Sequence, residues 1–181
     1  ALSKGFMAGD TARDELALEP EPVYRQLGIE ILKEFRATGV DRRKKTVAFS
    51  NRRRLRYDKL LLATGGTPRI PEIKGNRLPG FFLLRSLSDA DAIASALSRA
   101  KTVAVIGGSF LGLEVAASLR SRGLDVHVIA PDIVLMARVF GAGVGAFLKG
   151  RHEKSGIVFH LGRTVTEISG DRKVSGLILS D

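Results

Sequence analysis

The sequence predicts an α/β fold that contains a Rossmann-like βαβ unit, and two observations carry this prediction. Within residues 103–131, an apolar run at 103–106 leads into a glycine turn, a helical pattern follows over 114–122, and a second apolar run at 126–129 is predicted to be a parallel strand. Strand and helix patterns also alternate through the second half of the chain, which is typical of layered α/β proteins.

The turn between the first strand and the helix has the pattern of a dinucleotide-binding fingerprint. It consists of Gly107, Gly108, Ser109, Phe110, Leu111 and Gly112. In such a turn the first glycine makes the bend, the second lets the backbone approach a pyrophosphate, and the third lets the helix pack on the strand. Gly107 and Gly112 fit the outer roles, whereas Ser109 has a Cβ that narrows the approach and a hydroxyl that could donate to a phosphate. The alternative is a glycine turn that only connects two elements.

Composition excludes several classes of protein. The 181 residues are enough for one ordinary domain and marginal for two, and 44% are hydrophobic. No apolar run is long enough to span a membrane, and the first residues do not form a signal peptide, so we expect a soluble, cytoplasmic protein. The absence of cysteine excludes disulfides and CxxC redox pairs. The three histidines are too scattered for a metal site, and His127 is interpreted as a core or edge residue.

The formal net charge is +10, and it is concentrated in one segment. Its members are Arg42, Arg43, Lys44, Lys45, Arg52, Arg53, Arg54 and Arg56. Such a cluster is either a solvated hairpin face or a surface that attracts an anionic partner. Nucleic acid, an acidic protein and a polyanionic cofactor are the partner classes that this charge admits.

The elements before the glycine turn are predicted mostly as strands. A short helix at 23–27 follows Pro22, and Gly28 ends it. The predicted strands are 29–34, a small antiparallel meander around Val40, 46–49 and 55–57, and a buried run at 59–62 that ends in a small-residue turn. Residues 68–79, rich in proline, glycine and charge, are predicted to connect two domains.

Helices and strands alternate in the remainder. Residues 88–100 are predicted to be a helix because Asp89 and Asp91 lie in the first turn and Arg99 near the end. Gly123 is the expected C-terminal cap of the helix after the turn. A further helix is predicted over 143–154, with strands at 158–160, 165–169 and 174–179.

Four motifs occur in a set order and resemble one family. They are Leu2-Ser3-Lys4, the segment 57–69 (YDKLLLATGGTPR), Leu84-Arg85-Ser86 and the segment 107–114. Together they resemble the FAD-dependent NAD(P)H reductases of the pyridine nucleotide-disulfide oxidoreductase superfamily, which include ferredoxin reductases of the putidaredoxin type and apoptosis-inducing-factor-like proteins. The resemblance implies a partial, doubly wound FAD-binding domain over residues 1–80 and an NAD(P)-binding domain over 81–181. Because this chain has neither the family's first glycine fingerprint nor its C-terminal interface domain, we expect it to be a fragment.

The resemblance also implies site residues. Lys4 and Glu114 would form a catalytic pair at the flavin face, and Phe110 would cover the nicotinamide pocket. The implied cofactor contacts are Lys4, Ala37, Ala63, Thr64, Gly65, Arg85, the turn residues 107–112 and Glu114. Each role has a plain alternative, because Lys4 could be a mobile surface lysine, Glu114 could only complement the helix dipole, and Phe110 could pack beneath the helix.

The spacing after the turn bears on the choice of nicotinamide cofactor. An acid that binds the ribose is expected about 20 residues past the turn, and Asp132 is the candidate. No arginine immediately follows the strand to receive a 2′-phosphate, so we expect NADH to be preferred over NADPH.

On this basis the expected function is a flavoprotein oxidoreductase that passes hydride from NADH to FAD and then electrons to an acidic, ferredoxin-like acceptor. The alternative is a basic nucleic-acid-binding or apoptosis-inducing-factor-like module without reductase turnover. Against nucleic acid, aromatic residues make up only 6% of the chain. The assembly state is left open, with a homodimer among the options, and the isolated chain is expected to be inactive and to bind FAD weakly.

Overall fold

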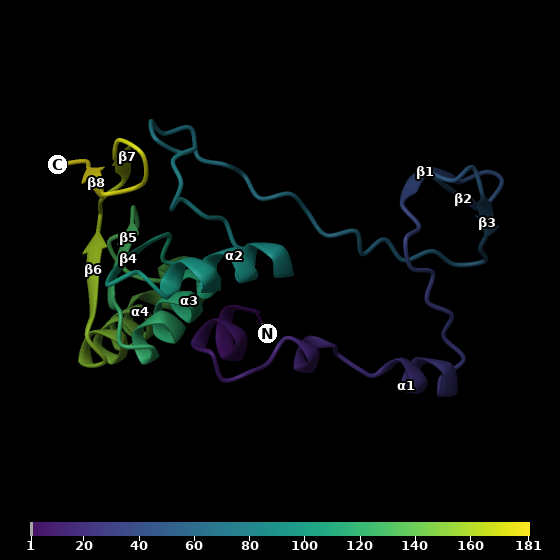
Figure 1. Cartoon of the computed structure of the whole chain (residues 1–181), viewed down its shortest axis with the longest axis horizontal. Helices are drawn as coiled ribbons and strands as arrows, with labels where there is room; N and C mark the ends of the chain where they lie inside the picture. The colour runs from purple at the N-terminus through teal and green to yellow at the C-terminus, as the bar shows by residue number, and fades with distance from the viewer. Residues whose placement is uncertain (1) are drawn as a thin grey trace. The chain divides into compact units, whose positions relative to one another are not determined.

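A computed structural model describes residues 2–181, which fold into two compact units. One unit combines the chain up to Leu16 with Thr67–Asp181, and the other is Ala17–Gly66. Figure 1 shows the elements of both units along the chain. These units do not coincide with the predicted halves 1–80 and 81–181. The assignment of those halves to FAD and NAD(P) stays a prediction, since compactness does not reveal what a segment binds.

A three-stranded parallel sheet forms the centre of the first unit. Its strands are β4 (Thr102–Ile106), β5 (Asp125–Ala130) and β6 (Ile157–Leu161), in that spatial order. The parallel register pairs Val103 with Val126 and Val126 with Ile157. The predicted α/β fold class and its Rossmann-like βαβ unit are therefore confirmed.

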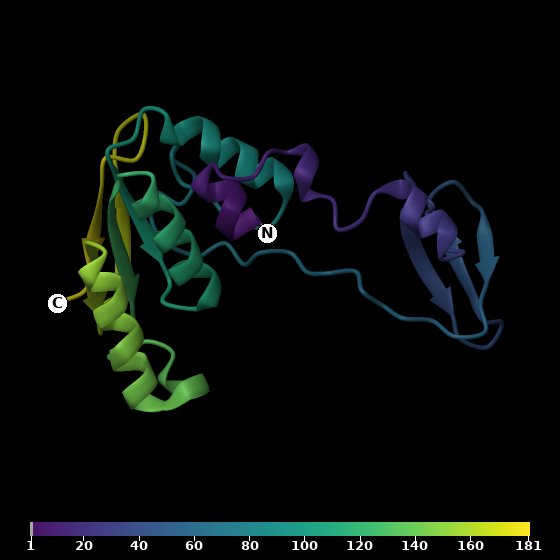
Figure 2. The ribbon, with the colours of Figure 1, turned by 90° about the horizontal axis from the view of Figure 1, so that it is seen from below.

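The helices of this unit are α2 (Leu87–Leu97), α3 (Phe110–Ser121) and α4 (Ala137–Lys154). Figure 2 shows the first residues of the chain beside α2 and α3. The main core lies between α2, α3, this N-terminal segment and the sheet. It contains Met7, Ala90, Leu97, Ala116, Leu119, Leu124, Val126, Val128 and Ile157. Met7 is fully buried, so the N-terminal segment belongs to the core and anchors the residues before it.

The helix ends follow from local chemistry. Ser86 caps α2 in a capping box with Asp89, and this hydrogen bonding lowers the pKa of Asp89. Gly123, at φ 81°, follows the last turn of α3 and confirms the predicted cap. Helix α4 begins six residues earlier than predicted, after Met136 in the left-handed conformation, and a break at Gly141 divides it.

A hairpin completes the first unit. Strands β7 (Val165–Ser169) and β8 (Gly176–Leu179) pair antiparallel and confirm the two predicted C-terminal strands. A second small core forms from Ile129, Val165 and Ile168. The predicted connection 68–79 runs to this hairpin, where Lys74 pairs with Glu167.

The second unit contains the predicted antiparallel meander. Its strands are β1 (Ala37–Asp41), β2 (Thr46–Phe49) and β3 (Arg54–Arg56), preceded by the short helix α1 (Glu21–Gln26). Pro22 lies in the first turn of α1, as its fixed φ favours. Phe35 packs edge-on against Phe49, and the guanidinium of Arg53 lies over the Phe35 ring.

Two predicted strands are wrong. Residues 29–34 form no strand, and Gly28 and Glu34 have left-handed backbone angles at either end of the segment. Residues 59–62 were expected to be a buried strand, yet Leu61 is 87% exposed and Leu62 66%. No described strand pairs with either segment. Without a neighbouring strand, the backbone of an apolar run lacks the inter-strand hydrogen bonds that define a strand.

The N-terminal stretch contains short turns of helix at Leu2–Phe6 and Asp14–Leu16. Among the described residues, no helix combines the length and apolar character that crossing a membrane requires.

Candidate functional site

The glycine turn has the tight geometry that its pattern predicts. Gly107 has φ 120°, and its N–H donates to the carbonyl of Ile129 at 2.8 Å. A Cβ on Gly112 would lie 2.1 Å from the carbonyl oxygen of Gly107, so only glycine allows α3 to pack this closely against the turn. A Cβ on Gly108 would lie 2.8 Å from the Leu135 side chain. The loop after β5 therefore contacts the turn directly.

The first turn of α3 has no side-chain cap on its backbone N–H groups. Ser109 is the N-cap, and its side chain makes no capping hydrogen bond. The first N–H groups of a helix have no partner inside the helix, and together with the helix dipole they favour an anion. A pyrophosphate therefore fits the residues present, and a Ser109 hydroxyl free of capping is available to donate to it.

Phe110 is the first residue of α3 and directly follows the N-cap Ser109. Its side chain is 56% exposed and contacts Phe140 edge-on, with ring centroids 5.4 Å apart. The alternative in which Phe110 packs beneath the helix is therefore wrong. Phe140 was not predicted as a site residue, because the break at Gly141 that turns the start of α4 toward Phe110 has no signal in the sequence beyond one glycine.

Asp132 lies just beyond the end of β5. Ala130, at the strand end itself, is buried, whereas the Asp132 side chain is half exposed. A guanidinium nitrogen of Arg138 approaches the Asp132 carboxylate at 3.7 Å. Sequence reasoning missed Arg138, because it is eight residues past the strand and comes near Asp132 only through the left-handed Met136. An acidic side chain from the loop and a basic side chain from the start of α4 therefore lie together beyond the end of β5.

Lys4 and Glu114 form an ion pair in the first unit. Lys4 Nζ lies 3.2 Å from Glu114 Oε1, and the Ser3 hydroxyl donates to Glu114 Oε2 at 2.6 Å. The Ser3 hydrogen bond lowers the pKa of Glu114 below its ordinary value, and Lys4 adds to the effect. Because α3 begins at Phe110, Glu114 lies in the second turn, and its carboxylate is engaged by Ser3 and Lys4. The alternative of a glutamate that only complements the helix dipole is therefore wrong, whereas Lys4 is an exposed lysine that forms an ion pair.

One face of α3, continued by its C-cap Arg122, holds the N-terminal segment at Ser3, Lys4 and Met7. Glu114, Ser118 and Arg122 are four residues apart and so lie on the same side of the helix. The Ser118 hydroxyl donates to the carbonyl of Ser3 at 2.8 Å, and Arg122 donates to the carbonyl of Met7 at 3.3 Å. Ser3 and Ser118 were not predicted as site residues, although the i, i+4 spacing from Glu114 to Ser118 is visible in the sequence.

The remaining residues assigned to FAD are divided between the two units. Arg85 is exposed in the first unit, where its backbone N–H donates to Asp89 at 3.0 Å. Ala37 lies on β1, and the exposed segment 63–65 has no regular structure, both in the second unit. No single flavin site is therefore described, and these assignments stay predictions.

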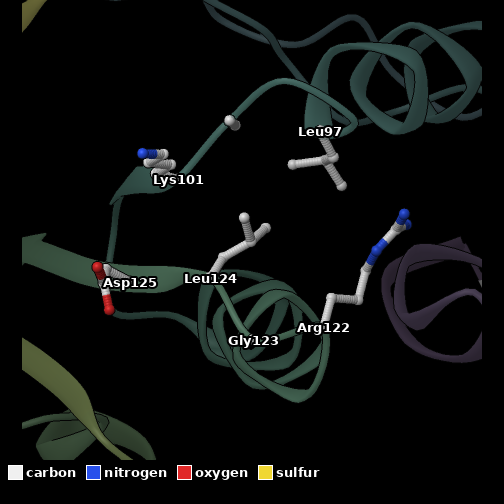
Figure 3. Close-up of a pocket in the computed structure, with 7 residues that line it drawn as sticks. Leu97, Lys101, Arg122, Gly123, Leu124 and Asp125 are labelled. Carbon is white, nitrogen blue, oxygen red and sulfur yellow. The ribbon is translucent and has the colours of Figure 1, made fainter.

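A hollow of about 430 Å³ lies at the opposite end of the strands (Figure 3). It is lined by Leu97, Ala100, Lys101, Arg122, Gly123, Leu124 and Asp125. Ligands of open α/β sheets bind beyond the carboxyl ends of the strands, whereas this hollow lies where β4 and β5 begin. Arg122 at its edge is already bonded to Met7. The hollow is therefore not the predicted cofactor site.

His127 is partly buried, as expected of a core or edge histidine. Its Nδ1 lies 3.0 Å from Nε2 of His160, and the two rings are nearly parallel with centroids 5.3 Å apart. The two nitrogens lie close to the line between the ring centres, so the rings meet edge to edge through one hydrogen bond. Among residues 2–181, no group of three or more potential metal ligands gathers at one place.

Comparisons with known proteins match nearly the whole of this chain. A family model described as pyridine nucleotide-disulphide oxidoreductase matches residues 1–181. The probable ferredoxin reductase CtmF of Castellaniella defragrans is 34% identical over 99% of this chain and 44% of its own length. Human apoptosis-inducing factor 3 is 36% identical over 93% of this chain and 27% of its own length.

Solved structures of reductases share the fold. A ferredoxin reductase from Rhodopseudomonas palustris superposes with a TM-score of 0.88 at 31% identity, covering 99% of this chain. Putidaredoxin reductase, in its covalent complex with putidaredoxin, superposes with a TM-score of 0.85 at 30% identity, covering 98% of this chain. In both cases the match covers 44% of the solved chain, so this chain spans less than half the length of these relatives.

Proposed function

The chain belongs to the pyridine nucleotide-disulphide oxidoreductase family, and from this membership we propose that it serves in a flavoprotein that passes hydride from NADH to FAD and then electrons to a ferredoxin-like acceptor. The observation that carries the proposal is the glycine turn, whose Gly112 leaves no room for a side chain and whose helix α3 begins with uncapped donors. When bound, the nicotinamide supplies hydride and the flavin divides the electron pair into single electrons.

The turn residues would hold the nicotinamide cofactor through its pyrophosphate. The backbone N–H groups at the start of α3 would donate to the phosphate oxygens, and the Ser109 hydroxyl would add a donor. Phe110 and Phe140 form an apolar wall that would exclude water from one side of the nicotinamide. The chain's contribution at this point is binding and orientation.

Lys4 and Glu114 would act at the flavin. The Lys4 ammonium beside a bound flavin would stabilise the negative charge that hydride adds to the ring. Glu114 would hold the ammonium in place, and Ser3 would in turn hold Glu114. Glu114 is a carboxylate at neutral pH even at the ordinary pKa of glutamate, and its lowered pKa favours that form further, so a negative charge would face Lys4.

NADH is the nicotinamide cofactor that we propose, on the grounds of Asp132. A carboxylate beside the ribose accepts hydrogen bonds from the 2′-hydroxyl and repels a 2′-phosphate. The guanidinium of Arg138 would favour NADPH, because it could bind a 2′-phosphate, but it forms an ion pair with Asp132. The preference for NADH therefore depends on this pair remaining intact.

A ferredoxin-like protein is the acceptor that we propose. Relatives named for their partners support this class, among them the ferredoxin reductase of Castellaniella defragrans and a rubredoxin-NAD(+) reductase of Pseudomonas putida, which is 34% identical over 93% of this chain. The net charge of +10 would attract an acidic carrier.

The test uses the full-length protein that contains this chain. NADH should bleach its flavin absorbance under anaerobic conditions, and a [2Fe–2S] ferredoxin should restore that absorbance. The Gly112→Val variant should lose reduction by NADH but keep reduction by dithionite, because the change blocks the turn and not the flavin. A protein without flavin absorbance, or equal NADH-driven rates in both proteins, would contradict the proposal.

A further inference from the structure

The basic residues of the meander separate into two groups. Lys44 and Lys45 lie in the turn between β1 and β2, and Arg56 at the end of β3 comes beside them because it pairs with Thr46. Arg52 and Arg54 lie at the turn between β2 and β3, which is the opposite end of these short strands. One run of positive charge in the sequence is therefore two surfaces in space.

The first of these surfaces surrounds an open hollow. The hollow has a volume of about 360 Å³ and is lined by Arg43, Lys44, Lys45, Arg56, Tyr57 and Asp58. We call these six residues the basic hollow. The four cations are exposed, and none of them forms an ion pair with a described residue. Only Asp58 brings negative charge to the lining.

The nearest other acid does not neutralise the basic hollow. The carboxylate of Asp41 accepts the backbone N–H groups of Arg43 and Lys44, at 3.0 and 2.9 Å. This interaction shapes the turn, as an aspartate at that position commonly does. The Asp41 side chain is therefore committed to the backbone, and the cations remain available to an external anion.

The shape and chemistry of the basic hollow favour the surface of an acidic protein. Sites for small molecules are mostly apolar and enclose their ligand, whereas this hollow is open and charged. Guanidinium and ammonium groups pair well with carboxylates. Single-stranded nucleic acid would need exposed aromatic rings for stacking, but Phe35 and Phe49 pack on each other and Tyr57 is the one aromatic residue of the lining.

We propose that the basic hollow docks carboxylate groups of an acidic electron-carrier protein and so steers that carrier to the reductase. This inference rests on the proposed function, because it identifies where the ferredoxin-like acceptor first makes contact. The surface formed by Arg52 and Arg54 carries charge of the same sign at the opposite end of the strands. It therefore provides the control.

The test compares two double variants of the full-length protein, Lys44→Glu with Arg56→Glu, and Arg52→Glu with Arg54→Glu. Both double variants change the net charge equally, and both retain the contact between the Arg53 guanidinium and the Phe35 ring. The binding of an oxidised, acidic [2Fe–2S] ferredoxin is measured by calorimetry, and kcat/KM for that ferredoxin is measured at several ionic strengths. We expect the first variant to lose about tenfold in both quantities at low salt and to show a weaker dependence on salt, and the control to change less than about threefold.

The outcomes are distinct. Equal losses in the two variants would mean that net charge alone steers the carrier, and no loss in either would mean that the carrier docks elsewhere; both results overturn the proposal. Binding of an oligonucleotide that the first variant alone abolishes, without an effect on ferredoxin, would also overturn it. Weakened ferredoxin binding in a protein that NADH does not reduce would uphold the docking surface and refute the proposed function.

Discussion

The hydroxyl of Ser3 donates to the carboxylate of Glu114 over 2.6 Å, across 111 positions of sequence. Ser3 is buried, and its own carbonyl accepts from Ser118 on the next turn of α3. The ammonium of Lys4, one residue further on, reaches the other oxygen of the same carboxylate. The position of Lys4 therefore depends on a buried neighbour and not only on a solvated ion pair, which by itself would contribute little.

Replacing Lys4 by methionine should slow the reduction of flavin by NADH in the full-length protein by about tenfold and leave NADH affinity nearly unchanged, since the charge that Lys4 stabilises develops mainly in the transition state. Stopped-flow absorbance at several NADH concentrations separates the limiting rate from the affinity. Lys74→Met, which removes a lysine paired with Glu167 in the same unit, is the matched control. An unchanged limiting rate in Lys4→Met would contradict the proposed role of Lys4 at the flavin.

Replacing Ser118 by alanine should destabilise the protein by about 1–2 kcal/mol, because the carbonyl of buried Ser3 would lose its donor. Ser121→Ala removes a hydroxyl that bonds the carbonyl of Ser118 at the exposed end of the same helix, and should cost less than about 0.5 kcal/mol. Urea unfolding followed by circular dichroism measures both changes. Equal losses of unfolding free energy in the two variants would show that the buried hydrogen bond stabilises the protein no more than the exposed one.

The Glu114 carboxylate should make the free energy of unfolding depend on pH in the acidic range. Its pKa is lowered in the folded state, so it contributes stability above the ordinary value of 4.5, and this contribution is lost as the pH falls through the lowered value. Wild-type protein should therefore be more stable than Glu114→Gln at pH 7, and the difference should shrink below about pH 4. Unfolding free energies of both proteins from pH 7 to pH 3 provide the measurement. A difference that stays constant or grows toward pH 3 would contradict the pKa direction.

The Asp132 and Arg138 pair should set the choice of nicotinamide. In Asp132→Asn the repulsive carboxylate is gone and Arg138 is free to bind a 2′-phosphate, so the ratio of kcat/KM for NADPH to that for NADH should rise about tenfold. Adding Arg138→Ala in that background should reverse most of the gain. Steady-state kinetics with both cofactors test this, and a ratio that stays the same in Asp132→Asn would show that the acid does not discriminate.

The βαβ unit could be predicted from sequence because its signals are local. Periodicity shows β4, α3 and β5, and the close contact of Gly112 with Gly107 is what the spacing of the glycines requires. The pair of Lys4 and Glu114 was expected from a family resemblance and not from any pattern, since no periodicity connects positions so far apart. The meander was found by its alternation of apolar and basic residues.

The failures concern residues whose structure depends on distant partners. The apolar run at 59–62 has the composition of a buried strand, but burial needs neighbouring strands, and none among the described residues pairs with it. Arg138 could not be foreseen, because the left-handed Met136 and the break at Gly141 set its direction. The single basic cluster of the sequence became two surfaces only through the register of β2 and β3.

The stripe of Glu114, Ser118 and Arg122 also connects the start of the chain to the glycine turn. Three contacts spread over two helical turns tie the segment around Lys4 to α3 and to the residue that ends it. The same helix begins at the glycine turn. We therefore expect a tilt of α3 on ligand binding at that turn to displace the Lys4 ammonium as well.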